Sequence, residues 1–193
     1  TNQLSAIERD GGLYRAFVRG GVSFEKQGQP IKRFHTYNSK LDTLGGDGYR
    51  ISDMVLNPID NSIWISNISS TEPLKCLAAD GKWYSFDISS VTTSREIYKI
   101  VIDQAGNKWL LMRGDGLILF NEKNITNTQD DIIRRYTEIP KTKYNSCQVS
   151  LLGVSDAVVD REGILWIATS KGVGYVLGCT YDPDEPCEFD VPI

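Results

Sequence analysis

The side chains that could take part in chemistry are few and scattered in this 193-residue sequence. Its single histidine, His35, lies between Phe34 and Thr36, and the sequence contains no Gly-x-Ser-x-Gly elbow, HExxH pair or glycine-rich phosphate loop. A hydrolase triad through His35 would lack a recognisable nucleophile and acid. A pair of carboxylates brought together by the fold stays open as an alternative. We therefore expect no catalytic residue, no cofactor and no metal site.

The cysteine spacing favours a disulfide over a metal site. The four cysteines form no CxxC pair, as a zinc site would require. Cys179 and Cys187 bracket a loop that contains two prolines, and a disulfide between them would place the chain in an oxidising compartment. The alternative is four separate thiols, with Cys76 buried. The fourth cysteine is Cys147.

Acidic residues recur at the turns between apolar runs. A carboxylate at such a position can accept hydrogen bonds from nearby backbone amides. A calcium loop would need a denser run of oxygen ligands than any of these turns provides. Asp182, Asp184 and Glu185 come nearest to a cation site, but we interpret their proline-bounded loop as a solvated acidic tip. The three turn acids are Asp60, Asp103 and Asp160.

A repeated pattern of short apolar runs organises the chain. Residues 97–121 contain three strand-like runs separated by glycine-containing turns, residues 154–177 repeat that order, and residues 51–67 repeat its first two runs. The tryptophans of the second run stand 45 and 57 residues apart, and Tyr14 occupies the same slot 50 residues before the first of them. Self-similarity at this period with strand-only content predicts β-propeller blades.

The sequence thus predicts an all-β fold: a β-propeller fragment of about four blades, each a four-stranded antiparallel sheet, around a central channel. Asp80-Gly81 is the strongest hairpin signal, and no segment shows the sustained 3.6-residue period of a helix. The predicted blades cover approximately residues 1–36, 51–88, 97–137 and 154–180. Residues 179–193 are expected to leave the last sheet as an exit segment.

The repeated residues are interpreted as structural. Each tryptophan lies between apolar neighbours, where a large ring can fill the core between adjacent blades. Trp83 and Tyr84 follow a hairpin turn outside the repeated position, so they are candidates for contact with a sugar or peptide, although packing between blades is the commoner role. The repeat residues are Trp64, Trp109, Trp166, Asp103, Asp160, Gly106 and Gly163.

Charge and hydropathy exclude several partners. The formal charge is −4 and the 21 lysines and arginines are scattered, which argues against a nucleic acid or an anionic membrane surface. No run of about 18 apolar residues is present, so nothing in the sequence reads as a membrane-spanning helix. Because the chain begins without Met or a signal peptide, we expect a piece of a longer protein, and the missing signal peptide says nothing about export.

Two segments, residues 101–109 and 158–173, resemble the repeats of the two-component-regulator propeller family. Those repeats pair an Asp-x-x-Gly turn with Trp-Ile-Gly-Thr, and here Ala168 replaces the usual glycine. Residues 64–86, followed by 98–109, look more like the PorZ-type propeller proteins of the type IX secretion system. The Gly-Val-Gly-Tyr exit at residues 172–175, into a segment with cysteine and proline, has the same likeness.

The resemblance implies an exported, non-enzymatic scaffold in the periplasm or at the cell surface that takes part in cargo processing and attachment. Its expected partners are protein subunits at the outer membrane or the remaining blades of the parent chain, together with a glycan or lipopolysaccharide. Loops 37–49 and 121–131 are expected to meet partners. Half of a larger ring would have open blade edges, which predicts a homodimer.

Two alternatives remain open from the sequence. The chain could be the periplasmic polysaccharide-sensing domain of a hybrid two-component histidine kinase, whose gene would continue into a transmembrane helix and a kinase. It could also be a propeller enzyme, which would need clustered acids or histidines at one mouth of the channel.

Overall fold

The structure is a computed structural model that describes residues 3–43, 48–68, 70–141, 148–180 and 182–191. Within these residues every regular element is a β-strand, so the all-β prediction is confirmed. The described chain accordingly offers no apolar helix long enough to cross a membrane. Cys147 and residues 44–47 of the predicted partner loop 37–49 lie outside the described residues. The chain forms two compact units, residues 1–88 with 95–100 and residues 89–94 with 101–193.

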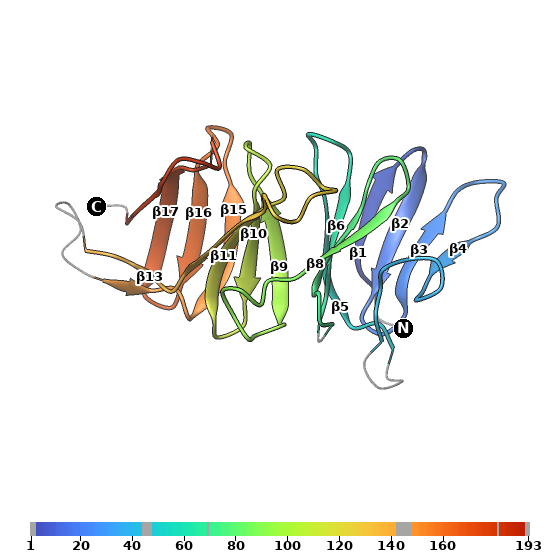
Figure 1. Cartoon of the computed structure of the whole chain (residues 1–193), viewed down its shortest axis with the longest axis horizontal. Helices are drawn as coiled ribbons and strands as arrows, with labels where there is room; N and C mark the ends of the chain where they lie inside the picture. The colour runs from blue at the N-terminus through green and yellow to red at the C-terminus, as the bar shows by residue number, and fades with distance from the viewer. Residues whose placement is uncertain (1–2, 44–47, 69, 142–147, 181, 192–193) are drawn as a thin grey trace. The chain divides into compact units, whose positions relative to one another are not determined.

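The first unit contains two four-stranded antiparallel sheets, each with its strands side by side in chain order (Figure 1). Tight turns join the strands, and Gly81 adopts a φ of 85° in the Asp80-Gly81 hairpin, a backbone angle that glycine reaches without steric cost. The first sheet comprises β1 (Gln3–Arg9), β2 (Gly12–Phe17), β3 (Gly21–Glu25) and β4 (Lys32–Phe34). The second comprises β5 (Ile51–Leu56), β6 (Ile63–Asn67), β7 (Leu74–Leu77) and β8 (Trp83–Phe86).

Side chains from the two sheets form the core of the first unit. Ile7 and Tyr14 of the first sheet pack in one cluster with Met54 and Ile65 of the second, and β1 lies against β5. Arg9 is only 5 % exposed. Its Nη2 donates to the Tyr14 hydroxyl at 3.0 Å and its Nη1 donates to the Leu77 carbonyl at 3.1 Å. A buried guanidinium therefore holds the tyrosine that replaces tryptophan in this repeat.

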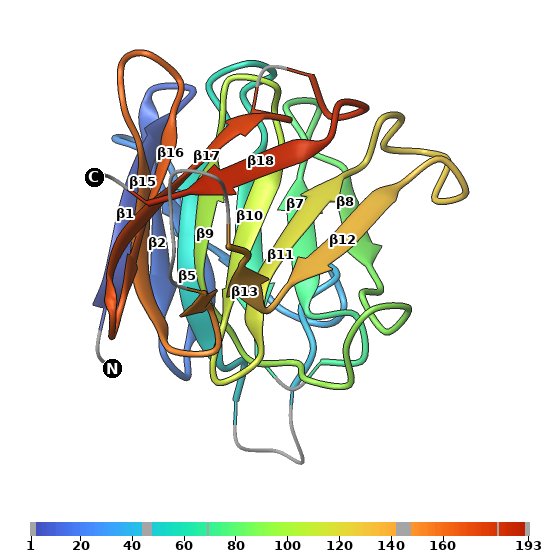
Figure 2. The same ribbon diagram turned by 90° about the vertical axis from the view of Figure 1, so that its left-hand side faces the viewer.

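The second unit contains two further four-stranded antiparallel sheets and a short two-stranded one (Figure 2). The first four residues of β9 belong to the first unit and the rest of that strand to the second. The third sheet comprises β9 (Ile97–Ile102), β10 (Lys108–Met112), β11 (Gly116–Asn121) and β12 (Ile132–Tyr136). The fourth comprises β15 (Val154–Val159), β16 (Leu165–Thr169), β17 (Gly172–Gly178) and β18 (Cys187–Asp190). The short sheet comprises β13 (Glu138–Ile139) and β14 (Val149–Ser150).

The expectation that residues 179–193 leave the last sheet is wrong. β18 pairs with β17 in antiparallel register, with Asp190 opposite Tyr175 and Cys187 opposite Gly178. Phe189 of this strand is buried. The chain turns back because Cys179 and Cys187 close the intervening loop covalently, which starts β18 beside the end of β17. The fourth sheet is therefore complete, with four strands.

The three tryptophans do not share one environment. Trp64 and Trp109 are both 0 % exposed, as expected for core residues. The expectation of a buried ring is wrong for Trp166, which is half-buried. Every residue of β6 and β10 is buried, whereas buried and part-exposed residues alternate along β16. The alternation shows that only one face of the fourth sheet is covered in the described chain.

Candidate functional site: the disulfide loop and the turn that holds it

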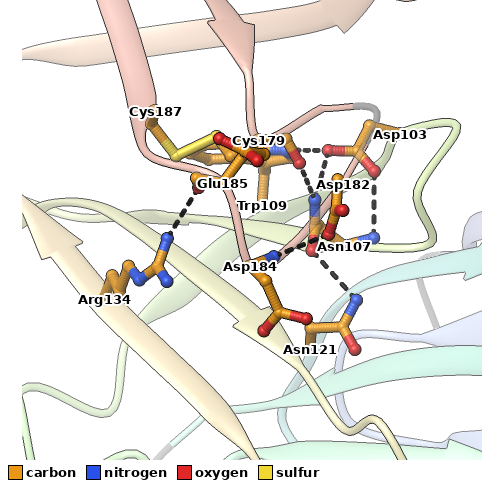
Figure 3. Close-up of a disulfide and its surroundings, with 10 residues drawn as sticks. All are labelled: Asp103, Asn107, Trp109, Asn121, Arg134, Cys179, Asp182, Asp184, Glu185 and Cys187. Atoms are coloured by element: carbon orange, nitrogen blue, oxygen red, sulfur yellow. Dashed lines mark hydrogen bonds between the residues drawn. A yellow bond between two sulfur atoms is a disulfide. The ribbon is translucent and has the colours of Figure 1, made fainter.

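The second unit presents one loop that is closed by a covalent bond. Cys179 and Cys187 form a disulfide, with their Cα atoms 4.7 Å apart (Figure 3). We call residues 180–186 the disulfide loop; residue 181 lies outside the described residues. Its three acidic side chains, Asp182, Asp184 and Glu185, are exposed. The loop thus displays negative charge on a constrained backbone.

One buried carboxylate organises the turn that supports this loop. Asp103 Oδ1 accepts the backbone amides of Ala105 at 3.0 Å and Asn107 at 2.9 Å. Its Oδ2 accepts the Asn107 side-chain amide at 2.8 Å and the Trp109 indole N–H at 2.7 Å. Gly106 completes the turn with a φ of 77°. The Asp-x-x-Gly turn is therefore fixed by its own aspartate.

The surroundings of Asp103 and Asp160 shift the pKa of each carboxyl in opposite directions. Burial raises the pKa of Asp103 above its usual value, although hydrogen bonds from Asn107 and Trp109 act against that shift. The hydrogen bond from Trp166 holds the pKa of the more exposed Asp160 below its usual value. Both acids are engaged in holding their own turns.

Asn107 and Ala105 attach this turn to the disulfide loop. The Asn107 side-chain amide donates to the Cys179 carbonyl at 2.7 Å, and the Ala105 amide donates to the Thr180 carbonyl at 3.1 Å. Asn121 donates to Asn107 Oδ1 at 2.9 Å. Both donor hydrogens and the oxygen of the Asn107 side chain are therefore in use (Figure 3).

Basic side chains of the third sheet hold the far side of the disulfide loop. Lys123 forms an ion pair with Asp184. Arg134, on β12, donates to the Glu185 carbonyl at 3.1 Å. Surface ion pairs are individually weak, so these contacts act mainly by orienting the loop. The loop is thus held by a disulfide at its base, two hydrogen bonds to the Asp103 turn and two contacts from the segment 123–134.

The predicted partner loop 121–131 carries a group that titrates near neutrality. Burial, together with repulsion from Asp130 and Glu122, raises the pKa of Asp131 to about 6. Lys108 is buried beside them and pairs with Glu122. The charge on this side of the third sheet therefore changes at about pH 6.

The repeated acids at the other turns serve the tryptophan of their own sheet. Asp160 Oδ2 accepts the Trp166 indole N–H at 2.6 Å, and Gly163 adopts a φ of 82° in that turn. In the second sheet a serine takes the place of the acid, because Trp64 donates to Ser62 Oγ at 2.9 Å. Ser62 in turn donates to Asp60 at 2.7 Å. The shared element is an oxygen acceptor for the indole.

The remaining candidates lie in the first unit. The ring of Trp83 lies 5.2 Å from that of Phe34 and packs against the core cluster, so it takes part in packing. Tyr84 is half-buried, opposite Cys76, which is a buried free thiol as expected. His35 lies 6.3 Å from the ring of Tyr37, which is exposed. Among the residues that the structure describes, no group of three or more His, Cys, Asp or Glu side chains is placed to hold a metal.

The comparisons with known proteins found likeness in structure alone. No family model matches the sequence, and no curated protein matches it. PorZ, an essential bacterial surface component of the type IX secretion system of Porphyromonas gingivalis, matches 98 % of this chain with a TM-score of 0.78 at 14 % identity. This chain spans 26 % of that PorZ chain.

Two other solved structures match as completely along this chain. The extracellular domain assigned to a hybrid two-component system of B. thetaiotaomicron matches 98 % of it and 23 % of its own length, with a TM-score of 0.61 at 15 % identity. An inactive variant of virginiamycin B lyase from Staphylococcus aureus matches 98 % of this chain and 55 % of its own, with a TM-score of 0.58 at 11 % identity. At these identities the likeness concerns the fold. The chain has an all-β fold of the propeller type, and the resemblance seen in the sequence is confirmed at that level.

Proposed function

We propose that this chain is part of an exported, non-enzymatic β-propeller scaffold that binds other proteins at the bacterial surface or in the periplasm. The observation that carries the proposal is the likeness to PorZ, with a TM-score of 0.78 over 98 % of the chain. In this proposal the four-stranded sheets are consecutive blades, of about residues 1–36, 51–88, 97–137 and 154 onward, around a central channel. Further blades or a second copy complete the ring.

The disulfide supports the exported location. Disulfides form and persist in oxidising compartments and are rare in the cytosol. Cys179 and Cys187 are joined, and the loop between them has a proline on each side of its acidic centre. A bond that closes an exposed loop is of most use where reducing agents are absent.

The disulfide loop is the surface that we assign to a protein partner. Its backbone is held by Cys179, Cys187, Asn107 and Arg134, so binding would order few additional residues. Three exposed carboxylates favour a partner with a basic surface, because complementary charge raises the association rate and selects among partners. A glycan or lipopolysaccharide is a further partner in this proposal, with Tyr84 as a contact.

A second candidate function is the sensing of a polysaccharide ligand by the extracellular part of a two-component system. It is favoured by the match to extracellular domains assigned to B. thetaiotaomicron signalling systems, with TM-scores of 0.61 and 0.62. Binding of soluble polysaccharide fragments, with no protein partner recovered, would select this candidate over the scaffold.

Thiol trapping on intact cells tests the exported location. We expect a small amine-reactive label that cannot cross the cytoplasmic membrane to reach the protein in unbroken cells of its source organism. We also expect Cys179 and Cys187 to react with an alkylating agent in denaturant only after reduction, since they are paired. Cys76, a free thiol buried in β7, is the internal control and should react in denaturant without reduction. Labelling only after lysis, with both cysteines already reactive, would contradict the proposal.

A further inference from the structure

One face of the fourth sheet is apolar and exposed. Val158, Trp166 and Tyr175 lie opposite one another on adjacent strands, so their side chains form one row on the same face. Ala168 and Val173 form the next row, and a hollow of about 230 Å³ lies along these residues. Val158 is 61 % exposed. We call this surface the fourth-sheet face.

An exposed apolar patch of this kind is typical of an interaction surface in a soluble protein. The tryptophans at the equivalent positions of the second and third sheets, Trp64 and Trp109, are fully buried, whereas Trp166 is not. The same sequence pattern thus places a fully buried tryptophan in the second and third sheets and a part-exposed tryptophan in the fourth. Among the three sheets that carry a repeat tryptophan, the fourth is therefore the one whose ring lacks a full cover in the described residues.

The second sheet shows how a face of this kind contacts the backbone of the first strand of the next sheet. Asp53 lies on β5, two residues before the residue opposite Trp64, and so on the same face as that ring. Its Oδ2 accepts the backbone amide of Ile100 at 2.7 Å, and Ser52 Oγ donates to the Ile97 carbonyl. All of these residues belong to the first unit. The Ser52-Asp53 pair therefore binds the backbone of the first strand of a following sheet.

The fourth sheet carries the same pair at the same place. Ser155-Asp156 lies on β15 at a β-bulge, as Ser52-Asp53 does on β5. Asp156 Oδ1 accepts the amide of the next residue at 2.8 Å, and Asp53 Oδ1 does the same at 2.8 Å. The fourth-sheet face thus combines an apolar row with a Ser-Asp pair at the same bulge position, where the Ser155 hydroxyl donates to the Ala168 carbonyl at 3.3 Å.

The first sheet carries a backbone amide at the position equivalent to the Ile100 amide. Ala6 precedes the residue opposite Tyr14, just as Met54 precedes the residue opposite Trp64. β9 has the same burial pattern as β5, and Ile100 occupies the position in β9 that Met54 occupies in β5. Ile100 is therefore also equivalent to Ala6 of β1. Ala6 is exposed. The amide of Ala6 therefore has the position in β1 that the amide of Ile100 has in β9.

The two faces also match in charge. On the first sheet, Ala6, Arg15, Ser23 and Arg33 lie in one row across the outer face, beside a hollow of about 200 Å³. On the fourth sheet, Glu188 and Asp190 lie on β18 in register with Leu177 and Tyr175 of that face. Both sheets have their strands in chain order, so stacking strand on strand puts β4 with Arg33 over acidic β18. The Ser23 hydroxyl is buried without a hydrogen-bond partner among the described residues.

We propose that the fourth-sheet face of one copy of this chain binds the outer face of the first sheet of a second copy. Asp156 accepts the Ala6 amide of the second copy, Val158 and Trp166 are buried, and Arg33 of the second copy meets Glu188 and Asp190. The contact is head to tail, because two different faces of the chain take part. This inference deepens the proposed function, because it rests on the option in which a second copy completes the ring; a monomeric chain would overturn it and leave the exported location untouched.

Sedimentation velocity over a range of concentrations tests the contact. The wild-type chain should associate into dimers or larger assemblies, and Val158→Glu should weaken association by about tenfold or more, because it places a carboxylate where the contact buries an apolar side chain. Ile59→Glu is the matched control, since Ile59 is 60 % exposed on the turn before β6 and belongs to neither the first nor the fourth sheet. It should associate as the wild type does. A wild-type chain that stays monomeric, or equal effects of the two substitutions, would overturn the proposal.

A mixing experiment tests the head-to-tail geometry. Ala6→Glu alters the outer face of the first sheet and should also prevent association, because it sets a carboxylate against Asp156. Val158→Glu keeps an intact first sheet, and Ala6→Glu keeps an intact fourth-sheet face. A mixture of the two variants should therefore form dimers through these two faces and nothing larger. Association by Ala6→Glu alone at wild-type strength would show that two fourth-sheet faces bind each other, and the proposal would be wrong.

Discussion

At the residue scale, Asp103 and Asp160 occupy the same position in two repeats but lie in different surroundings. Asp103 is 3 % exposed and Asp160 is more exposed, although each accepts an indole N–H and backbone amides. Removing the acceptor of a buried donor costs more stability than removing the acceptor of an exposed donor, because water cannot replace the buried partner. The two aspartates thus occupy equivalent positions in the repeat, but their hydrogen bonds contribute unequally to the stability of the fold.

We predict unequal costs for the same substitution at these two sites. Asp103→Asn replaces one acceptor oxygen with an NH2 donor that faces N–H donors in the interior and should lower the free energy of unfolding by about 3 kcal/mol. Asp160→Asn should lower it by clearly less, since water reaches that turn. Urea unfolding of the two variants, with unchanged m-values as the control for the unfolded state, measures both. Equal losses would show that burial does not distinguish the two turns.

The residues of the candidate site were only partly predictable. The sequence showed Asp103 and Gly106 through their repetition, and left the cysteine pairing open between a disulfide and free thiols. It gave no signal for Asn107, Asn121 or Arg134, because the partners of these side chains lie on other strands and their pairing depends on the assembled sheets. Arg9 was missed for the same reason: its acceptors, Tyr14 and Leu77, come together only when two sheets pack.

At the element scale, the strands with strong apolar patterns were predicted well. The three runs predicted within residues 97–121 are observed as β9, β10 and β11, and the Asp80-Gly81 hairpin joins β7 to β8 as expected. β18 was missed because Cys187–Asp190 contains a single large apolar residue between two acids. Its strand conformation comes from pairing with β17, which is a tertiary effect that local propensity does not contain.

The disulfide should stabilise the second unit through its effect on the unfolded chain. Closing a loop of this length is worth about 2–3 kcal/mol. We predict that the double variant Cys179→Ser, Cys187→Ser lowers the free energy of unfolding by that amount and speeds hydrogen exchange at the amides of β18. A reducing agent should reproduce the effect in the wild type and leave the double variant unchanged. Slow exchange at β18 in the double variant would show that β17 alone fixes that strand.

At the scale of the whole molecule, one module recurs four times with different degrees of burial. Each copy is a four-stranded antiparallel sheet with a tryptophan or tyrosine on its second strand, at Tyr14, Trp64, Trp109 and Trp166. The repeat in the sequence predicted the module because tight turns and alternating apolar residues are local signals. It could not predict which copy would have an exposed face, because the sequence pattern is the same in all copies.

The central claim of the proposed function is that these modules are consecutive blades around one channel. An experimental electron-density map of the chain at a resolution that shows side chains tests it most directly. The account predicts that the first strand of each four-stranded sheet, β1, β5, β9 and β15, lines a common channel, with Tyr14, Trp64, Trp109 and Trp166 on equivalent faces. Sheets stacked as a sandwich, or first strands directed away from a shared axis, would contradict it.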